Sequence, residues 1–387
     1  MKNIIIIGSR GYKFEYGGWE TFVTNLIDNY KEADTRFYVP ELSFDKTKKD
    51  RVENDVRIHP IYVKPQGNAT MLTFAIKAVL FYKKMIKNEK MKNVVMYILG
   101  CRVGPLFLFI HKSLERLGVK IMINPDGLEW KREKWNYLIK QYFKISERTM
   151  IKSSLVVVND SLAIKEYVDN KYKKYHVDTT YISYGAYLKD VKDTKKTKEF
   201  FKEKDIKENN YYLFVGRFVP ENNIEYIIKE FMKTNIDKDL VIVSNVTENS
   251  FYNSLIEKTN FLDDKRIKFV GGVYDDSILR YIRKYATAYI HGHSAGGTNP
   301  SLLEALSITD VNILYDVSYN REVGLDNVLY FNKNDDSLKD VIYKVENFNK
   351  EEKEKYGILA KKRINEAYTW DIVAFKYKEL FERVLDK

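Results

Sequence analysis

The chain has 387 residues, of which 44% are hydrophobic and 31% charged, and its formal net charge is +11. This globular composition excludes a disordered chain, and the length favours two domains over one. The single cysteine, Cys101, excludes an internal disulfide, and no apolar run reaches the roughly 20 residues of a membrane-spanning helix, so we expect a cytoplasmic protein.

Short apolar runs alternate with helical patterns through the first half of the chain. The first run, residues 4–8, ends in glycine and is followed by a glycine-rich loop and a helix predicted at about residues 19–30. Further strands are predicted at residues 36–39, 56–63, 94–99, 120–123 and 155–158. This alternation predicts one doubly wound parallel α/β domain over residues 1–185.

The second half repeats the same alternation after a polar stretch, residues 189–207, which we interpret as a linker and an exposed helix. Strands are predicted at residues 211–215, 240–243, 267–270, 288–291, 312–315 and 328–330. Open parallel sheets bind ligands at the carboxyl ends of their strands. We therefore expect two α/β domains whose loops face one central cleft.

The segment Tyr16-Gly17-Gly18-Trp19-Glu20 lies between the first predicted strand and the first predicted helix. Two adjacent glycines let a backbone approach a ligand closely, and the N-terminus of the following helix suits a phosphate. A plain strand-to-helix turn is the alternative, and the glycine spacing does not match the dinucleotide fingerprint.

Arg217 follows the first strand of the predicted second domain and belongs to the segment Val215-Gly216-Arg217-Phe218-Val219-Pro220-Glu221-Asn222-Asn223. An arginine at the carboxyl end of such a strand points to the ligand side of the sheet, where its planar guanidinium suits a diphosphate. An ordinary surface arginine is the alternative.

Residues 289–306 carry the most candidate site residues. A predicted strand gives way to Gly296-Gly297-Thr298 and then to a helix with Pro300 in its first turn, so several backbone N–H groups are aimed at one spot and predict an anion site. Glu304 lies about one turn into that helix and could accept hydrogen bonds from sugar or ribose hydroxyls. An exposed helix carboxylate is the alternative.

His291 and His293 could chelate a metal, but no third ligand stands at a recognisable spacing, so we predict no metal site. Asp237-Lys238-Asp239 matches the D-x-D pattern of metal-dependent transferases in form, but it precedes a predicted strand, and we interpret it as a turn.

Asp126 lies in the segment Asn124-Pro125-Asp126-Gly127-Leu128-Glu129-Trp130-Lys131-Arg132, directly after the strand predicted at residues 120–123. In a loop at the carboxyl end of the sheet, its carboxylate could accept a proton from an attacking hydroxyl or bind an acceptor sugar. Pro-Asp-Gly is also a common turn.

Together the four motifs resemble bacterial rhamnosyltransferases of glycosyltransferase family 4, which build capsular and rhamnan polysaccharides. The resemblance covers nearly the whole chain and is carried by Y-G-G-W-E, N-P-D-G-L-E-W-K-R, G-R-F-V-P-E-N-N and H-G-H-S-A-G-G-T-N-P-S-L-L-E-A. It implies the GT-B fold, with Rossmann-like domains for the acceptor (residues 1–185) and the nucleotide sugar (residues 186–369). The ending Tyr368-Thr369-Trp370-Asp371 implies a last helix, residues 370–387, that packs back on the first domain.

The resemblance further implies a retaining transfer of L-rhamnose from dTDP-β-L-rhamnose to glucose or N-acetylglucosamine on a lipid diphosphate. The implied linkage is β-1,4, and neither a cofactor nor a metal is expected. Carried over by motif, Asp126 and Arg217 are the expected catalytic residues. The expected donor-binding residues are Gly17, Gly18, Arg217, Asn222, His293, Gly296, Gly297, Thr298, Asn299 and Glu304. The expected acceptor-binding residues are Tyr16, Trp19, Glu20, Asp126 and Glu129.

Two positions depart from the pattern of the broader family. Gly296 stands where many members carry a Glu that contacts the donor sugar, and Asn222 stands where many carry a Lys that adds charge at the diphosphate. The rhamnose donor therefore rests on the resemblance to the subgroup. The alternatives are a UDP-hexose transferase of the same fold and a non-catalytic nucleotide-sugar-binding subunit.

Residues 131–152 combine seven basic residues with interleaved aromatic and aliphatic ones, a pattern that suits the surface of an anionic bilayer. We therefore expect peripheral association with the inner face of the cell membrane. A helix packed on the first domain with solvated lysines is the alternative. The positive charge also suits nucleic acid, but no nucleic-acid motif accompanies it, so we expect no such partner.

Overall fold

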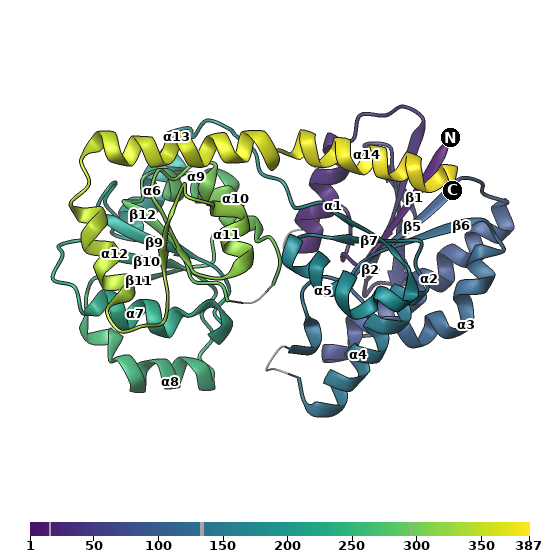
Figure 1. Ribbon diagram of the computed structural model, residues 1–387, viewed down its shortest axis with the longest axis horizontal. Coiled ribbons are helices and arrows are strands. Elements are labelled where there is room, and N and C mark those ends of the chain that lie inside the picture. Colours follow the sequence, from purple (N-terminus) through teal and green to yellow (C-terminus); the bar gives the residue numbers. More distant parts are fainter. Residues whose placement is uncertain (15–16, 132–134, 295) are drawn as a thin grey trace. The chain divides into compact units, whose positions relative to one another are not determined.

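The computed structural model describes residues 1–14, 17–131, 135–294 and 296–387. The chain divides into two compact units, the first made of Met1–Gly185 with Trp370–Lys387 and the second of Ala186–Thr369. Each unit is an α/β structure built on one central sheet (Figure 1). The predicted acceptor contact Tyr16 lies outside the described residues.

The sheet of the first unit has the strand order β3-β4-β2-β1-β5-β6-β7-β8, and its neighbouring strands are parallel except β3 with β4. The strands are β1 (Lys2–Ile7), β2 (Thr35–Ser43), β3 (Arg51–Glu53), β4 (Val56–Tyr62), β5 (Val94–Leu99), β6 (Val119–Asn124), β7 (Val156–Asn159) and β8 (Asp178–Tyr181). The helices are α1 (Gly18–Asn29), η1 (Gly67–Ala69), α2 (Thr70–Glu89), α3 (Gly104–Glu115), η2 (Glu129–Lys131), α4 (Tyr137–Lys152), α5 (Leu162–Tyr172), η3 (Lys173–Tyr175) and α14 (Trp370–Asp386).

Helices cover both faces of this sheet, which is why its central strands are apolar on both sides. Side chains of β1 such as Ile5 and Ile7 share one core with α2, α3, α4 and α5. On the other face, Tyr97 of β5 meets Tyr377 of α14, with their hydroxyl oxygens 2.8 Å apart. The last helix of the chain therefore packs on β5 and α1 and completes the core on this face.

The sheet of the second unit is parallel throughout, in the order β11-β10-β9-β12-β13-β14. The strands are β9 (Tyr211–Val215), β10 (Asp239–Val243), β11 (Ile267–Gly271), β12 (Ala288–His291), β13 (Asn312–Tyr315) and β14 (Leu329–Phe331). The helices are α6 (Lys195–Glu203), η4 (Pro220–Asn222), α7 (Ile224–Met232), α8 (Ser250–Thr259), η5 (Phe261–Asp263), α9 (Asp276–Lys284), α10 (Pro300–Leu306), α11 (Ser318–Gly324), α12 (Ser337–Glu346) and α13 (Lys350–Ala367).

This sheet also has two covered faces. Alternate residues of β9 point to opposite sides, so that Tyr212 and Phe214 pack with α7, α8 and α12, whereas Leu213 and Val215 pack with α6, α9 and α10. The polar stretch predicted as a linker and exposed helix contains α6, which exposes its lysines but buries Phe201 in the second of these cores.

Every strand predicted from the sequence overlaps an observed strand, and β3 and β8 are additional. The strand order reverses between β1 and β5 in the first sheet and between β9 and β12 in the second. Ligands of open parallel sheets bind at such reversals, beyond the carboxyl ends of the strands. None of the described helices combines the length and apolar character that a membrane span requires.

Candidate functional site

The loop after β1 forms hydrogen bonds with the buried carboxylate of Glu20. Glu20 accepts hydrogen bonds from the backbone N (2.9 Å) and Nε (3.0 Å) of Arg10. Gly17 has φ of 144°, and a Cβ there would lie 1.7 Å from Oε2 of Glu20, so this turn requires glycine. Gly18, by contrast, has open space around it among the described residues. The predicted acceptor residue Glu20 thus has a structural partner, and its contact with a ligand stays a prediction.

Asp126 lies in a tight turn at the carboxyl end of β6. Its φ is +63°, a left-handed conformation that Asp tolerates, and its backbone N donates to Oδ1 of Asn124 at 2.8 Å. Asp126 lines a narrow recess together with the predicted acceptor residue Glu129. The full lining is Gly100, Cys101, Arg102, Pro125, Asp126, Glu129, Trp130, Phe143 and Glu147. Trp19 is placed differently, edge-on to the ring of Tyr184.

Glu147 of α4 is a buried carboxylate that also lines this recess. It accepts hydrogen bonds from the hydroxyls of Tyr167 (2.7 Å) and Tyr172 and pairs with Nζ of Lys171 at 3.3 Å. Burial, and then the charge of Glu147, raise the pKa values of Tyr167 and Tyr172 well above their ordinary value, so both tyrosines remain donors. All three of these contacts are made by Oε1 of Glu147.

In the second unit, hydrogen bonds join the loop after β9 to the loop after β12. Nδ2 of Asn223 donates to the carbonyl of Gly292 at 2.7 Å, and the backbone N of Ser294 donates to the carbonyl of Glu221 at 2.9 Å. A Cβ at position 292 would lie 2.3 Å from the carbonyl oxygen of Asn222, so only glycine allows this approach. The predicted donor loops thus form one rigid substructure at the strand-order reversal.

Arg217 projects from this substructure with an exposed side chain. Its fixed part is the carbonyl oxygen, which accepts hydrogen bonds from Nδ2 of Asn222 (2.7 Å) and from the backbone N of Val219 (2.9 Å). The predicted donor residue Asn222 therefore positions the Arg217 backbone. Among the described residues, none forms a hydrogen bond or ion pair with the guanidinium, and its contact with a ligand stays a prediction.

In the predicted anion site after β12, a side chain of the protein already accepts a hydrogen bond from one of the backbone N–H groups. Oδ1 of Asn299 caps α10 by accepting from the backbone N of Ser301 at 2.9 Å. Thr298 is buried, whereas a Cβ built on Gly296, with φ of 127°, would meet none of the described atoms within 4 Å. Position 296 is thus the open part of this loop among the described residues.

Glu304 forms an ion pair that its position in the sequence did not reveal. Its Oε2 lies 2.7 Å from Nη2 of Arg283, whose side chain is only 2% exposed. The same Nη2 lies 3.2 Å from Oγ of Ser301, which is 3.1 Å from the hydroxyl of Tyr289. Arg283 therefore holds the carboxylate predicted to bind the donor pentose. No spacing pattern in α9 marks this arginine as a partner of Glu304.

His291 and His293 are buried with their rings stacked, 4.2 Å between centroids. Burial lowers the pKa of both, and nearby Arg217 also lowers that of His293, to about 3. The hydroxyl of Tyr289 lies 3.0 Å from Nδ1 of His291. Both imidazoles are therefore neutral at physiological pH.

We expect acidification to destabilise the second unit. The unfolded histidines bind protons below about pH 6.5 whereas the folded ones do not, so the stability present above pH 6.5 is lost as pH falls towards 3. Each histidine contributes up to about 1.4 kcal/mol per pH unit over that range. Urea unfolding at pH 7 and pH 5 measures the free energy of unfolding. Between these two pH values it should fall less for His293→Asn than for the wild type. His176→Asn, a change at an exposed histidine, is the control, and equal pH slopes for both variants would contradict the assignment.

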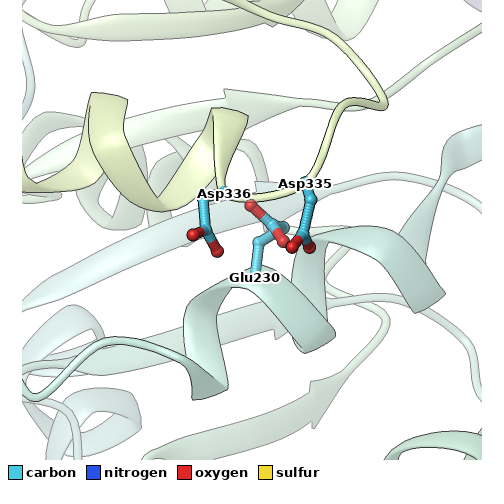
Figure 2. A group of neighbouring side chains, drawn as sticks. All are labelled: Glu230, Asp335 and Asp336. Carbon is cyan, nitrogen blue, oxygen red and sulfur yellow. The ribbon is translucent and has the colours of Figure 1, made fainter.

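Metal-ligating groups gather at one place in the described part of the chain, the carboxylates of Glu230, Asp335 and Asp336 (Figure 2). Two lysine ammonium groups already pair with these three carboxylates. Nζ of Lys233 lies 2.6 Å from Glu230, contacts Asp335 and is 3.1 Å from Asp336, which Lys339 also contacts at 2.7 Å. This cluster ties α7 to the start of α12.

In the D-x-D segment, Lys238 pairs with Glu346 and Asp239 with Lys268.

Two family models match the chain. The model described as Domain of unknown function (DUF1972) matches residues 1–187, and the model described as Glycosyl transferases group 1 matches residues 195–363. A protein described as an uncharacterized glycosyltransferase of Methanocaldococcus jannaschii is 27% identical over 403 residues, which cover 100% of both chains.

Solved structures resemble the whole chain at low identity. Sucrose-phosphate synthase from Thermosynechococcus elongatus has a TM-score of 0.82 and 15% identity over 100% of both chains. HepE of Anabaena in complex with UDP has a TM-score of 0.72 and 11% identity over 99% of this chain and 100% of that one. At these identities the likeness shows the fold alone, and it confirms the predicted GT-B fold.

Proposed function

We propose that this protein is a glycosyltransferase that transfers L-rhamnose from dTDP-L-rhamnose. The match of residues 195–363 to the glycosyl transferases group 1 model, within a GT-B fold, supports the transferase activity. The proposed acceptor is glucose or N-acetylglucosamine on a lipid diphosphate, joined through a β-1,4 linkage with retention of the anomeric configuration. The donor and acceptor rest on the sequence motifs that resemble the rhamnosyltransferase subgroup.

One observation carries the proposal: the two donor loops are joined by hydrogen bonds, and the Arg217 guanidinium projects freely from them. A planar cation on a rigid support can bind a diphosphate and stabilise the charge that develops when the sugar departs. Front-face attack needs no protein nucleophile, because the departing phosphate accepts the proton of the acceptor hydroxyl. Arg217 then stabilises the leaving group, and Asp126 binds the acceptor or the reacting centre.

A UDP-hexose donor is the second candidate. The observation in its favour is the similarity of the fold to HepE, which was solved with UDP. The two donors differ in their nucleoside and their sugar, so a direct assay separates them.

We also propose that the first unit binds the inner face of the cell membrane. Large apolar side chains are exposed on neighbouring helices, among them Phe109 of α3 (81% exposed) and Leu138 of α4 (76%). Basic residues recur every four positions along α4, at Lys140, Lys144, Arg148 and Lys152. Apolar groups that insert and cations that attract anionic headgroups are the features of interfacial binding. Sedimentation with phosphatidylglycerol vesicles, but not with phosphatidylcholine vesicles, is the expected result.

The transfer reaction is tested by mass spectrometry of purified protein with EDTA, dTDP-L-rhamnose or a UDP-hexose, and glucose or N-acetylglucosamine on a lipid diphosphate. We expect addition of rhamnose in the presence of EDTA. Addition only from a UDP-sugar would keep the glycosyltransferase but replace the donor. If neither donor is used, donor binding without turnover would favour a non-catalytic role.

A further inference from the structure

Three lysine ammonium groups surround one tryptophan ring in the first unit. The Nζ atoms of Lys131, Lys144 and Lys171 lie 5.6, 4.9 and 5.0 Å from the centroid of the Trp130 indole. They come from three different elements, η2, α4 and α5. Each ammonium is attracted by the ring, but the three like charges repel one another.

Only part of this charge is neutralised by the protein. Lys171 pairs with the buried carboxylate of Glu147. Within residues 1–14, 17–131, 135–294 and 296–387, no carboxylate forms an ion pair with Lys131 or Lys144. Lys131 and Lys144 therefore lack a paired carboxylate among the described residues, and an anionic ligand would relieve the repulsion among the three ammonium groups.

The same indole also lines the recess that contains Asp126 and Glu129. Trp130 thus adjoins two kinds of polar group, the carboxylates of the recess and the lysine ammonium groups near its ring. Carboxylates accept hydrogen bonds from sugar hydroxyls, whereas ammonium groups bind phosphate. Trp130 is the residue that the carboxylate group and the ammonium group share. A ligand that carries a phosphate next to a sugar therefore matches this arrangement.

We propose that Lys131 and Lys144, held around Trp130, bind the phosphate groups of a phosphorylated sugar acceptor whose sugar lies at the Asp126 turn. The inference deepens the proposed function and rests on it for the identity of the acceptor. Lys171 has a supporting role, because it compensates Glu147 and adds to the positive potential.

A second group of cations in the same unit provides the comparison. Arg148, Lys152 and Lys174 lie 6.0, 6.0 and 5.3 Å from the ring of Tyr175, so this ring is as rich in cations as Trp130. Tyr175 does not line the recess. A general attraction for anions would use both groups alike, whereas a site for a phosphorylated sugar uses only the group at Trp130.

The test compares Lys144→Gln with Lys174→Gln, since each removes one ammonium group from beside an aromatic ring. Both variants are assayed with a soluble sugar diphosphate acceptor and with the same sugar as a neutral alkyl glycoside. We expect Lys144→Gln to lower the preference for the diphosphate acceptor, measured as the ratio of the two kcat/KM values, by at least about tenfold. Lys174→Gln should keep the ratio of the wild type. Lys171 is left intact because its loss would strand a buried carboxylate.

Equal changes in both variants would overturn the site, because they indicate a general electrostatic effect. An unchanged ratio in Lys144→Gln would overturn it as well. If the wild-type protein glycosylates neither acceptor, the proposed function fails, and calorimetry with inorganic pyrophosphate then decides on the site alone. Weaker binding in Lys144→Gln than in Lys174→Gln supports the site, and equal binding refutes it.

Discussion

Replacing Arg217 with alanine is expected to lower the transfer rate by about 100- to 1000-fold, the usual effect of removing one group that stabilises charge in a transition state. The fold should tolerate the change, because the protein uses the carbonyl oxygen of Arg217 while its side chain is exposed. Initial rates at saturating donor, compared with the wild type, measure the effect.

Arg217→Lys is the matched control for this prediction. It keeps the charge but loses the planar fork, so we expect an intermediate rate if two-point contact with a diphosphate matters. Unfolding temperatures of both variants should match that of the wild type. A near-normal rate for Arg217→Ala would contradict the assignment of this residue to the diphosphate site. The donor loops would then have no proposed cation.

Replacing Phe381 with alanine is expected to destabilise the first unit by about 3–5 kcal/mol, although residue 381 lies at the opposite end of the sequence. Phe381 is fully buried in α14, beside Tyr30 and Tyr377. A cavity at this position removes packing from the core that α14 shares with α1 and β5. Urea unfolding, followed by fluorescence and by limited proteolysis, measures the loss.

Phe231→Ala provides the comparison, because Phe231 is equally buried but belongs to α7 in the second unit. The two variants should shift different transitions, or change the protease sensitivity of different fragments. If both variants shift the same unfolding transition and the same fragments, the prediction that residues 370–387 stabilise the first unit separately from the second is contradicted.

The sequence predicted the strands well for a physical reason. Buried parallel strands such as β5 and β9 are continuous apolar runs, and such runs stand out between polar loops. The two missed strands are short, polar and half-exposed: β3 is Arg-Val-Glu, and β8 is Asp-Thr-Thr-Tyr. Their pairing depends on neighbouring strands, which a local pattern does not contain.

The contacts of the site residues were harder to predict from the sequence, because motif spacing identifies a loop but not the partners of its side chains. Glu20 and Glu304 were predicted to contact substrates, and each is held by an arginine from elsewhere in its unit. Asn299 has a structural role as a helix cap. The cations at Trp130 come from separate elements, so only the folded chain brings them together.

The chain leaves the first unit after Gly185 and returns to it at Trp370, and this has a consequence for synthesis on the ribosome. The second unit is continuous, so all its residues emerge before the last helix of the first. At translation rates of about 5–20 residues per second, the first unit waits roughly 10 to 40 s for α14. During that time helix α1 and strand β5 lack the helix that packs on them, so a nascent chain stalled before Trp370 should engage chaperones through residues 1–185.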